Sequence, residues 1–306
     1  MTYDHYGNPD VLEPTELPRP KVGPDEVLIK VRAASVNPID WKVMAGGLDA
    51  LLEIEFPAIP GWDVAGVLEE VGLDTPEFSV GDEVIAYARK DWVHGGTFAE
   101  YVSAPVRTVA RKPAALDWDQ AAGLPLAGLT AYQLLTRLGT GKGDTVLVHA
   151  AAGGVGTLAV QIARVLGARV IGTASPANHD FLRSLGAEPV EYGDGPAERV
   201  RELAPDGVDV VADFVGGVLD ATRAVLAEGG RHGSVVDATV AEAGGLYCWV
   251  RPDAAHLQFL AGLADAGELT VPVARVFPLA EAADAFRLNQ QGHGRGKIVV
   301  RVASTS

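Results

Sequence analysis

The stretch TVLVHAAAGGVG, residues 145–156, decides the fold class. It begins with an apolar run, Thr145 to His149, that is typical of a buried strand, and it continues as a glycine-rich turn. A helical pattern follows and stops at Gly167, a residue suited to a left-handed cap. The apolar face of that helix carries Val155, Leu158, Ala159, Ile162, Ala163 and Leu166. A strand, a glycine turn and a helix in this order predict the opening of a parallel α/β sheet.

The turn between this strand and helix has the composition of a dinucleotide-binding turn. Small residues at 151, 153 and 156 permit a tight turn, close approach of the backbone to a pyrophosphate, and close packing of the helix on the strand. The N-terminus of the helix adds amide donors and a favourable dipole. The alternative is a purely structural turn, since any tight connection between a strand and a helix can be rich in glycine. We predict that the cofactor phosphates bind at Ala152, Gly153, Gly154, Val155 and Gly156.

The end of the next strand indicates which dinucleotide binds. An Asp or Glu about 20 residues beyond the turn would bond the ribose hydroxyls of NAD, but this chain has Thr-Ala-Ser at 173–175. A cofactor with a 2′-phosphate meets no repulsion there, and Ser175 can donate a hydrogen bond to it. We therefore expect NADP, as NADPH, rather than NAD. Asn178, His179 and Arg183 are possible further donors, although solvated polar residues are the simpler interpretation of the last two.

The rest of the chain separates into two textures. Strand-like and helix-like segments alternate from about Trp118 onward, which predicts a parallel sheet, and the further apolar runs are 169–173, 208–213 and 231–236. The first hundred residues are rich in turns and predict a β-dominated domain, with short runs at 27–32, 64–71, 83–87 and 97–102. The alternation ends before the C-terminus, and we expect the last segments to rejoin the first domain. Those segments are 271–277, 279–288 and 297–302.

The composition is that of an ordinary soluble globular protein. The 306 residues carry a formal charge of -15, which repels phosphate backbones and anionic lipid headgroups. Cys248 is the only cysteine, so a disulfide framework and a clustered thiolate metal site are both excluded. The longest apolar stretch is broken by Gly, Pro and polar residues, and we expect neither a membrane span nor a secretory signal. We expect a cytoplasmic protein without nucleic-acid or membrane partners.

Short motifs along nearly the whole chain carry a family resemblance. They are VNPIDWK at 36–42, PGWDVAG at 60–66, GDEV at 81–84, GGTFAEY at 95–101, GLTAY at 128–132, LGA at 185–187 and GKIVV at 296–300, together with the glycine turn. On these residues the chain resembles the zinc-independent medium-chain dehydrogenases/reductases, close to the NADPH:quinone oxidoreductases. The resemblance implies an α/β protein with three segments and a homodimeric assembly. The segments are a GroES-like, β-rich catalytic domain at 1–117, a Rossmann NADP-binding domain with a doubly wound parallel sheet at 118–262, and a C-terminal return to the catalytic domain at 263–306.

The metal ligands of zinc-containing relatives are missing from this sequence. Those relatives place a Cys where this chain has Asn37, and a Gly-His-Glu where it has Gly61-Trp62-Asp63. The seven histidines show no pair at short metal-ligand spacing, so we expect no metal. Hydride addition to a simple ketone builds a localised alkoxide that generally needs a Lewis acid or a strong proton donor. A quinone or an enone spreads the charge instead, so a metal-free site favours conjugated acceptors.

The resemblance implies a catalytic group drawn from two parts of the chain. Asn37 would lie near the nicotinamide ribose and the substrate, and Thr130 and Tyr132 would lie on a helix that faces the cofactor. Tyr132 and Asp40 are hypotheses for the proton donor, with bulk water as the alternative. Plainer roles stay open: a turn residue at Asn37, a core tyrosine at Tyr132, and a solvated pair of Asp40 with Lys42.

The same resemblance implies further residues that bind the cofactor. Lys297 would approach it from a C-terminal strand beside the cleft between the domains. Tyr192 would flank the adenosine phosphate, and Phe214 and Val215 would line the far side of the cofactor. With the glycine turn and Ser175, these residues complete the predicted cofactor site.

Together these features predict an NADPH-dependent oxidoreductase that transfers hydride directly to a small quinone or α,β-unsaturated carbonyl without zinc. Two alternatives stay open. An enoyl-thioester reductase on the same scaffold would need a basic patch for its bulky carrier, which the acidic composition does not indicate. A catalytically silent NADPH-binding sensor or structural protein would bind the cofactor without turnover.

Overall fold

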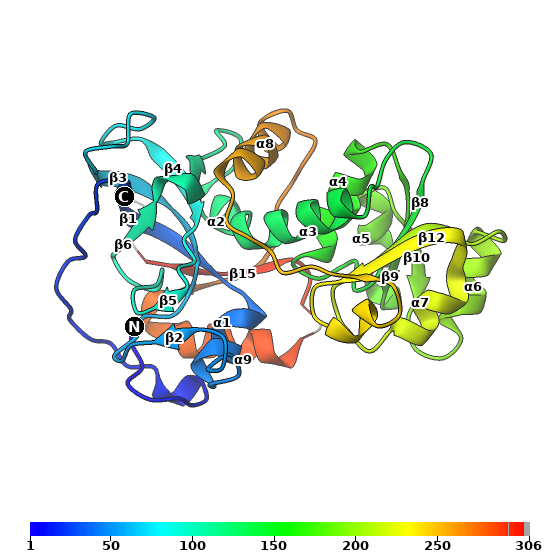
Figure 1. The fold of residues 1–306 in the computed structure, drawn as a ribbon, viewed down its shortest axis with the longest axis horizontal. Coiled ribbons are helices and arrows are strands. Elements are labelled where there is room, and N and C mark those ends of the chain that lie inside the picture. Colours follow the sequence, from blue (N-terminus) through cyan, green and yellow to red (C-terminus); the bar gives the residue numbers. More distant parts are fainter. Residues whose placement is uncertain (293, 303–306) are drawn as a thin grey trace. The chain divides into compact units, whose positions relative to one another are not determined.

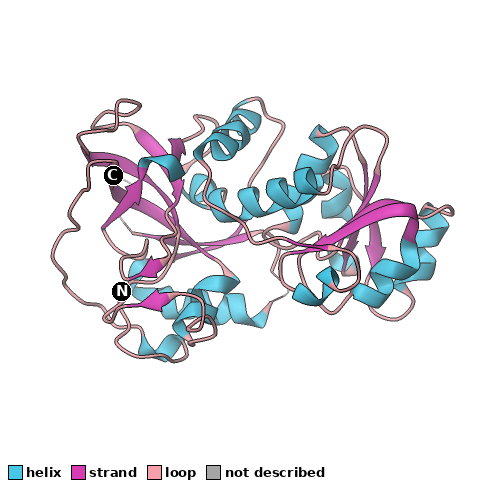
Figure 2. Ribbon diagram, in the orientation of Figure 1, coloured by secondary structure: helices cyan, strands magenta, loops and turns pink. Residues whose placement is uncertain are grey.

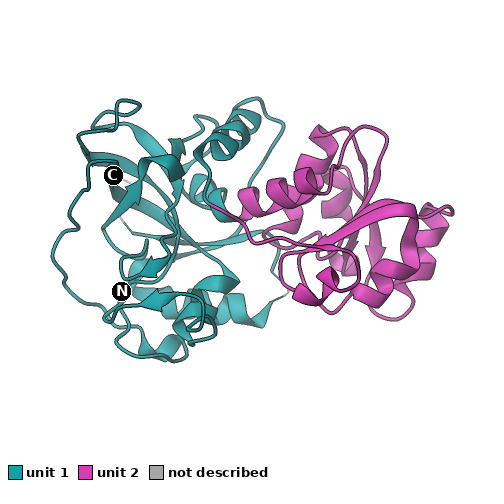
Figure 3. Ribbon diagram, viewed as in Figure 1, with its two compact units in different colours: residues 1–126, 252–306 teal, residues 127–251 magenta. Residues whose placement is uncertain are grey.

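The computed structural model describes residues 1–292 and 294–302, and the chain divides into two compact units (Figures 1 and 3). Unit 1 comprises residues 1–126 and 252–306, and unit 2 comprises residues 127–251. The domain division expected at 117/118 and 262/263 stays a prediction. Two helices that it assigns to the Rossmann domain, α2 (Trp118–Ala122) and α8 (Ala254–Asp265), contact strands of unit 1.

Unit 1 is built on a largely antiparallel sheet, drawn as arrows in Figure 2. The strand order is β14 (Val273–Pro278), β15 (Lys297–Arg301), β1 (Glu26–Val36), β3 (Asp63–Val71), β4 (Glu83–Tyr87) and β7 (Val109–Arg111), and β6 (Tyr101–Pro105) pairs with β1. Strands β14 and β15 run parallel. The short strands β2 (Glu53–Ile54) and β5 (Trp92–Val93) pair separately. Alternating apolar residues of the central strands form one core, which includes Val27, Ile29, Val31, Val64, Leu68 and Val84.

A second core of unit 1 lies where helices cover the sheet. The helix α9 (Ala282–Gln291) contacts α1 (Pro38–Met44) and the strands β14 and β15. The buried residues of this second core include Tyr3, Val36, Met44, Phe98, Phe286 and Val300. Strand β15 pairs antiparallel with β1, in a register that sets Val36 opposite Ile298. The start of β15 therefore lies beside the end of β1, although about 260 residues separate them in the chain.

Unit 2 is a parallel six-stranded sheet flanked by helices. The strand order is β10 (Glu188–Glu191), β9 (Arg169–Ala174), β8 (Thr145–Val148), β11 (Val208–Asp213), β12 (Leu226–Ser234) and β13 (Leu246–Tyr247). Its helices are α4 (Gly156–Val165), α5 (His179–Ser184), α6 (Pro196–Leu203), α7 (Leu219–Val225) and most of α3 (Pro125–Arg137). Numbered from β8, the order reads 3-2-1-4-5-6, which is the Rossmann arrangement.

The predicted fold class is confirmed: a GroES-like β-rich unit and a Rossmann unit share the chain. The strand and helix around the glycine turn match β8 and α4 to within one residue at each boundary. The strands β10 and β13 were not predicted, because both are short and lack an apolar run. Short 3-10 turns lie at Pro9–Val11, Val106–Thr108, Pro176–Asn178, Ala238–Ala241 and Leu279–Glu281. Among the described residues, no helix has the length and apolar character needed to cross a membrane.

Candidate functional site

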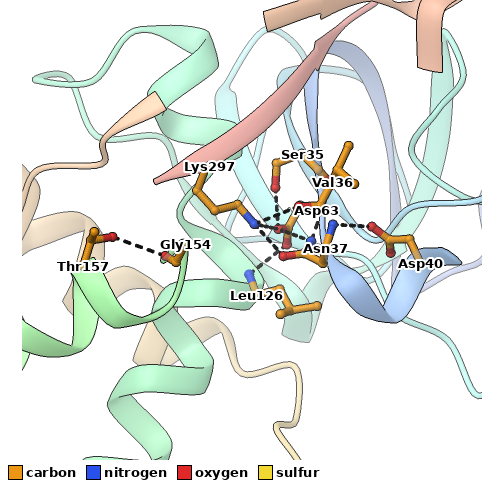
Figure 4. A network of polar contacts seen from close by, with 9 residues as sticks. All are labelled: Ser35, Val36, Asn37, Asp40, Asp63, Leu126, Gly154, Thr157 and Lys297. Carbon is orange, nitrogen blue, oxygen red and sulfur yellow. Dashed lines mark hydrogen bonds and ion pairs between the residues drawn. The ribbon is translucent and has the colours of Figure 1, made fainter. Parts of the chain in front are cut away.

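The glycine turn of unit 2 is shaped by close backbone contacts. Ala150 adopts a left-handed conformation with φ 54°, and its N–H donates to Thr173 Oγ1 at 3.1 Å. A Cβ at position 156 would lie 2.1 Å from the Ala150 carbonyl oxygen, so only glycine fits there. Gly153 donates its N–H to Ala150 O, and Thr157 Oγ1 donates to Gly154 O at 3.4 Å (Figure 4). The turn delivers the chain to the start of α4 at Gly156, where Thr157 N and Leu158 N donate to Gly153 O and Val155 O.

This turn follows β8 at the point where the strand order of the sheet reverses. Strands β8 and β11 are neighbours, and His149 N donates to Ala212 O at 3.0 Å. The carboxyl ends of parallel strands at such a switch point form the ligand-binding edge of an open α/β sheet. Phe214 and Val215 follow β11 directly. The structure thus brings the glycine turn and the Phe214–Val215 segment to adjacent strand ends, as a dinucleotide site requires.

Asp213, which the sequence analysis missed, fixes the loop that carries Phe214 and Val215. Its Oδ1 accepts hydrogen bonds from Val215 N at 2.8 Å and Gly216 N at 2.9 Å. Its Oδ2 accepts from Ser234 Oγ at 2.7 Å, at the end of β12. The carboxylate is buried and joins two neighbouring strand ends. An acidic residue at the end of a predicted strand was the available signal.

The end of β9 carries no carboxylate at 173–175. Ser175 precedes the 3-10 turn Pro176–Asn178, and its Oγ accepts a hydrogen bond from Asn178 Nδ2 at 3.2 Å. Arg183 forms an exposed ion pair with Asp180 at 2.6 Å. Ser175 and Asn178 are therefore placed together, whereas Arg183 has its own acidic partner.

The other predicted residues of unit 2 lie in different settings. Thr130 is buried in α3, and Tyr132, two residues later, is partly exposed. Tyr192 follows β10 and is half exposed. Their roles toward cofactor and substrate stay predictions.

A cluster of charged and polar side chains is buried in unit 1 where four segments meet (Figure 4). Ser35 and Asn37 come from the end of β1, Asp63 begins β3, and Lys297 begins β15. The register of the sheet sets Ser35 opposite Asp63, which brings the segments together. The side chains of Asp63 and Lys297 are 0% and 4% exposed. The cluster is thus enclosed by the protein.

Asp63 is the centre of this cluster. Its Oδ2 accepts from Ser35 Oγ and from Asn37 Nδ2, both at 2.8 Å. Its Oδ1 accepts from Leu126 N at 2.7 Å, in the first turn of α3. Lys297 Nζ lies 3.8 Å from Asp63 Oδ2. Three donors and one ammonium surround this carboxylate, and the sequence analysis did not select it or Ser35.

Lys297 and Asn37 interact directly. The ammonium donates to Asn37 Oδ1 and to Val36 O, the latter at 3.3 Å. Burial lowers the pKa of Lys297 and raises the pKa of Asp63, while the opposite charge of each group counteracts the shift in the other. Protonation of Asp63 would cost it one of the three hydrogen bonds that it accepts. We therefore assign an Asp63 carboxylate paired with a Lys297 ammonium. The Asn37 amide is therefore held between a cation and an anion.

Asp40 lies next to this cluster as a buried acid. Its Oδ2 accepts from Asn37 N at 2.7 Å, and its Oδ1 is buried without a hydrogen-bond partner among the described residues. Burial raises the pKa of Asp40 to about 8, with the Asp63 charge adding to the rise and the Asn37 N–H and Lys297 opposing it. Asp40 is thus neutral at pH 7. Its burial excludes the solvated pair with the exposed Lys42.

Comparisons with known proteins place this geometry in a family. The family described as "Alcohol dehydrogenase GroES-like domain" matches residues 23–114, and the one described as "Zinc-binding dehydrogenase" matches residues 185–300. The "Chloroplast envelope quinone oxidoreductase homolog" of Arabidopsis thaliana is 33% identical, over 98% of this chain and 97% of its own length. The chain belongs to the quinone oxidoreductase family of medium-chain dehydrogenases/reductases.

Two further relatives show the same similarity over nearly the whole chain. The chloroplastic "NADPH-dependent alkenal/one oxidoreductase" of Arabidopsis thaliana is 37% identical, over 97% of this chain and 78% of its own length. The solved quinone oxidoreductase from Coxiella burnetii superposes with a TM-score of 0.87 at 37% identity, and it covers 99% of this chain and 98% of its own. The family is one of oxidoreductases, and the names of two relatives state NADPH or NAD(P)H as the cofactor. Other relatives carry chloroplastic or mitochondrial names, so the cytoplasmic location stays a prediction.

Zinc, which the name of one matching family implies, does not fit this donor set. The positions that correspond to zinc ligands in relatives are Asn37, Trp62 and Asp63. Here Trp62 packs edge-on against Tyr87 at 6.1 Å between ring centroids, and Asn37 and Asp63 converge on the Lys297 ammonium. A protein cation already contacts both oxygen-bearing side chains, and zinc favours nitrogen and sulfur ligands in a tetrahedron. In the described part of the chain, no three His, Cys, Asp or Glu side chains gather in a metal-holding group.

Proposed function

We propose that this protein is an NADPH-dependent reductase of quinones or α,β-unsaturated carbonyls that works without zinc. The observation that carries the proposal is the Lys297 ammonium held between the Asn37 amide and the Asp63 carboxylate. It supplies a positive charge at positions where zinc-containing relatives have their ligands. The names of relatives that reduce quinones or alkenals support the same acceptor class.

We argue the chemistry of the acceptor from the side chains at these positions, which do not form a set of ligands for a Lewis-acidic metal ion. A conjugated acceptor gains hydride at its β-carbon and the electron pair moves to the carbonyl oxygen; Tyr132, Asp40 or solvent supplies the proton. The negative charge is delocalised in the resulting enolate or hydroquinone anion. Such a charge needs hydrogen-bond donors and a fixed cation rather than a metal ion. A simple ketone would build a localised alkoxide and is expected to be a poor substrate.

The residues of unit 2 fit a dinucleotide, because the contact at Gly156 leaves no room for a side chain. When bound, NADPH supplies the hydride. Amides at the start of α4 would hold its pyrophosphate, and Ser175 would donate to its 2′-phosphate. Phe214, Val215 and Tyr192 would cover the cofactor, and we propose Lys297 as a further cofactor-binding residue. Asp213 would keep the Phe214–Val215 segment in place.

The preference for NADPH over NADH rests on the end of β9. A carboxylate there would accept hydrogen bonds from the ribose hydroxyls and repel a 2′-phosphate. This chain has Ser175 instead, beside Asn178. Both side chains can donate hydrogen bonds to a phosphate, so we propose tighter binding of NADPH.

The test is NADPH oxidation by chelator-treated protein whose zinc content is measured. We expect turnover of a benzoquinone and an open-chain enone at less than stoichiometric zinc, and little turnover of a saturated ketone. Saturable NADPH binding without oxidation by any acceptor would leave the silent binder. Preference for a coenzyme A thioester over the free enone would favour the enoyl-thioester reductase instead.

The assembly is a separate proposal. We propose a homodimer, as the family resemblance implies, with residues 245–250 as one contact region. Strand β13 lies at the edge of the unit 2 sheet, and an edge strand is a place where a second chain can pair. Light scattering on the purified protein would measure the mass, and a monomer at micromolar concentration would refute this proposal.

A further inference from the structure

The Lys297–Asp63 pair differs from the other ion pairs of the described chain in its burial. Arg301 and Asp119, for comparison, have side-chain exposures of 40% and 12%. Removing two charges from water is expensive, and a buried pair can often be replaced by apolar residues without loss of stability. Stability alone therefore gives no reason for a lysine and an aspartate here, and a functional reason has to be considered.

The pair also fixes the orientation of the Asn37 amide. Nδ2 donates to Asp63 Oδ2 at 2.8 Å, and Oδ1 accepts from the Lys297 ammonium. Rotating the amide by half a turn would point its NH₂ group at the ammonium and its oxygen at the carboxylate. Both contacts would be repulsive. The two charges therefore permit one orientation of Asn37.

Asp63 further connects Asn37 to the start of α3. Its Oδ1 accepts from Leu126 N at 2.7 Å, where an anion also interacts favourably with the dipole of the helix. The same carboxylate thus holds the end of β1 and the first turn of the helix that later carries Thr130 and Tyr132. Loss of its charge would disturb both segments and leave the ammonium uncompensated.

We propose that the chain keeps the Lys297–Asp63 pair for catalysis: Asp63 is a positioning residue that holds the Lys297 ammonium and the Asn37 amide, and the ammonium stabilises the anion that forms when the acceptor takes up hydride. The proposal rests on the proposed function. Lys297 acts through Asn37 and through its field, because its ammonium donates to Asn37 Oδ1 and Val36 O and faces Asp63 Oδ2 at 3.8 Å. This role goes beyond the cofactor contact that the sequence predicts for Lys297.

The proposal makes the effect of the charge depend on the acceptor. An enolate is more basic than a hydroquinone anion and holds its charge on fewer atoms, so it gains more from a nearby cation. Removing the cation should therefore slow enone reduction more than quinone reduction. A purely structural role for the pair would lower both rates by the same factor.

The experiment compares Lys297→Met, Asp63→Asn and the double variant with the full-length wild-type protein. Urea unfolding gives the stability, and steady-state kinetics give kcat and KM for a benzoquinone and for an open-chain enone. Lys112→Met is the matched control, since Lys112 is a buried lysine in unit 1 that pairs with Glu83 at 3.4 Å. The double variant removes both charges and so avoids an uncompensated buried ion.

We expect each single variant to be destabilised and the double variant to recover stability near that of the wild type. For Lys297→Met and the double variant, kcat for the enone should fall at least about tenfold, and by a larger factor than kcat for the quinone. Lys112→Met should retain both activities.

Equal losses with both acceptors, or restored turnover in the double variant, would overturn the proposal and leave the proposed function intact. A wild-type protein that reduces neither acceptor would refute the proposed function and this inference with it.

Discussion

The two candidate sites of this protein, one in each unit, are built from different kinds of groups. In unit 2 the glycine turn consists of consecutive small residues, and its geometry comes from backbone contacts such as Ala150 N to Thr173 Oγ1. In unit 1 the cluster consists of buried charges, Asp63 and Lys297, that more than 230 residues separate in the chain. We propose that the first binds the cofactor through its shape and backbone amides, and that the second acts through its charge. A substitution at each should therefore fail in a different way.

The largest effect is expected at the glycine turn. In Gly156→Val the new side chain would collide with the Ala150 carbonyl, 2.1 Å from the Cβ position, and displace the start of α4. The NADPH dissociation constant should rise at least about 100-fold, equivalent to ~2.7 kcal/mol. Fluorescence titration measures it.

Gly141→Ala is the control for this variant, because a Cβ there has no atom within 4 Å. Unchanged binding in Gly156→Val would show that the tight turn is structural only. The contrast between a glycine turn that depends on shape and a unit 1 cluster that depends on charge would then disappear.

A negative charge introduced at Ser175, in the candidate cofactor site of unit 2, sharpens the comparison. In Ser175→Asp, the carboxylate would repel a 2′-phosphate and accept hydrogen bonds from ribose hydroxyls. The ratio of NADPH to NADH affinity should fall roughly 10- to 100-fold, since a partly screened pair of like charges is repulsive by a few kcal/mol. Competition titrations with both cofactors measure the ratio, and an unchanged ratio would refute the assigned role of Ser175.

Asp213 provides a smaller effect in unit 2, where a charge supports a backbone loop. Asp213→Asn keeps the volume but weakens the charge-assisted hydrogen bonds from Val215 N and Gly216 N. We expect KM for NADPH to rise about tenfold with a smaller change in kcat. A change in kcat alone would show that this loop does not act through cofactor binding.

The last comparison concerns the pH dependence of stability in unit 1 rather than cofactor binding. Asp40 has a pKa of about 8 in the folded protein, against 3.8 as its ordinary value. Between these values the folded protein binds a proton that the unfolded chain releases, so stability falls as pH rises through the window. The slope from this group is up to about 1.4 kcal/mol per pH unit and ends above pH 8.

Asp40→Asn removes this titration. Urea unfolding at pH 5, 6, 7 and 8 should show that the variant loses less stability than the wild type as the pH rises. Parallel stability curves would contradict the assignment of a buried neutral acid at position 40.

The glycine turn is local in the chain and the unit 1 cluster is not, which explains what the sequence could predict of each. The strand, turn and helix at 145–166 are local, so hydrophobic periodicity and glycine spacing located them to within a residue or so. The family resemblance pointed to Asn37 and Lys297 separately. Neither local pattern indicated that their side chains meet, because that contact depends on the pairing of β15 with β1. Asp63 and Ser35 were missed for the same reason.

Domain boundaries are hard to place from composition for a related reason. Composition changes at Trp118, where the helix-rich texture begins, but α2 packs against β1 and β3 of unit 1. A segment can have the texture of one domain and the packing partners of another. The proposed acceptor class also rests on tertiary geometry, since we argue it from the cation at the cluster rather than from any contiguous motif.

The most direct test of the account follows a label from the cofactor into the product. NADPH carrying deuterium at the transferable position of C4 would be mixed with an open-chain enone and protein from which zinc has been removed, and the product would be analysed by mass spectrometry and NMR. We expect one deuterium on the β-carbon of the enone, at a rate that added zinc does not increase. Product without deuterium at that carbon, or turnover that appears only when zinc is restored, would contradict it.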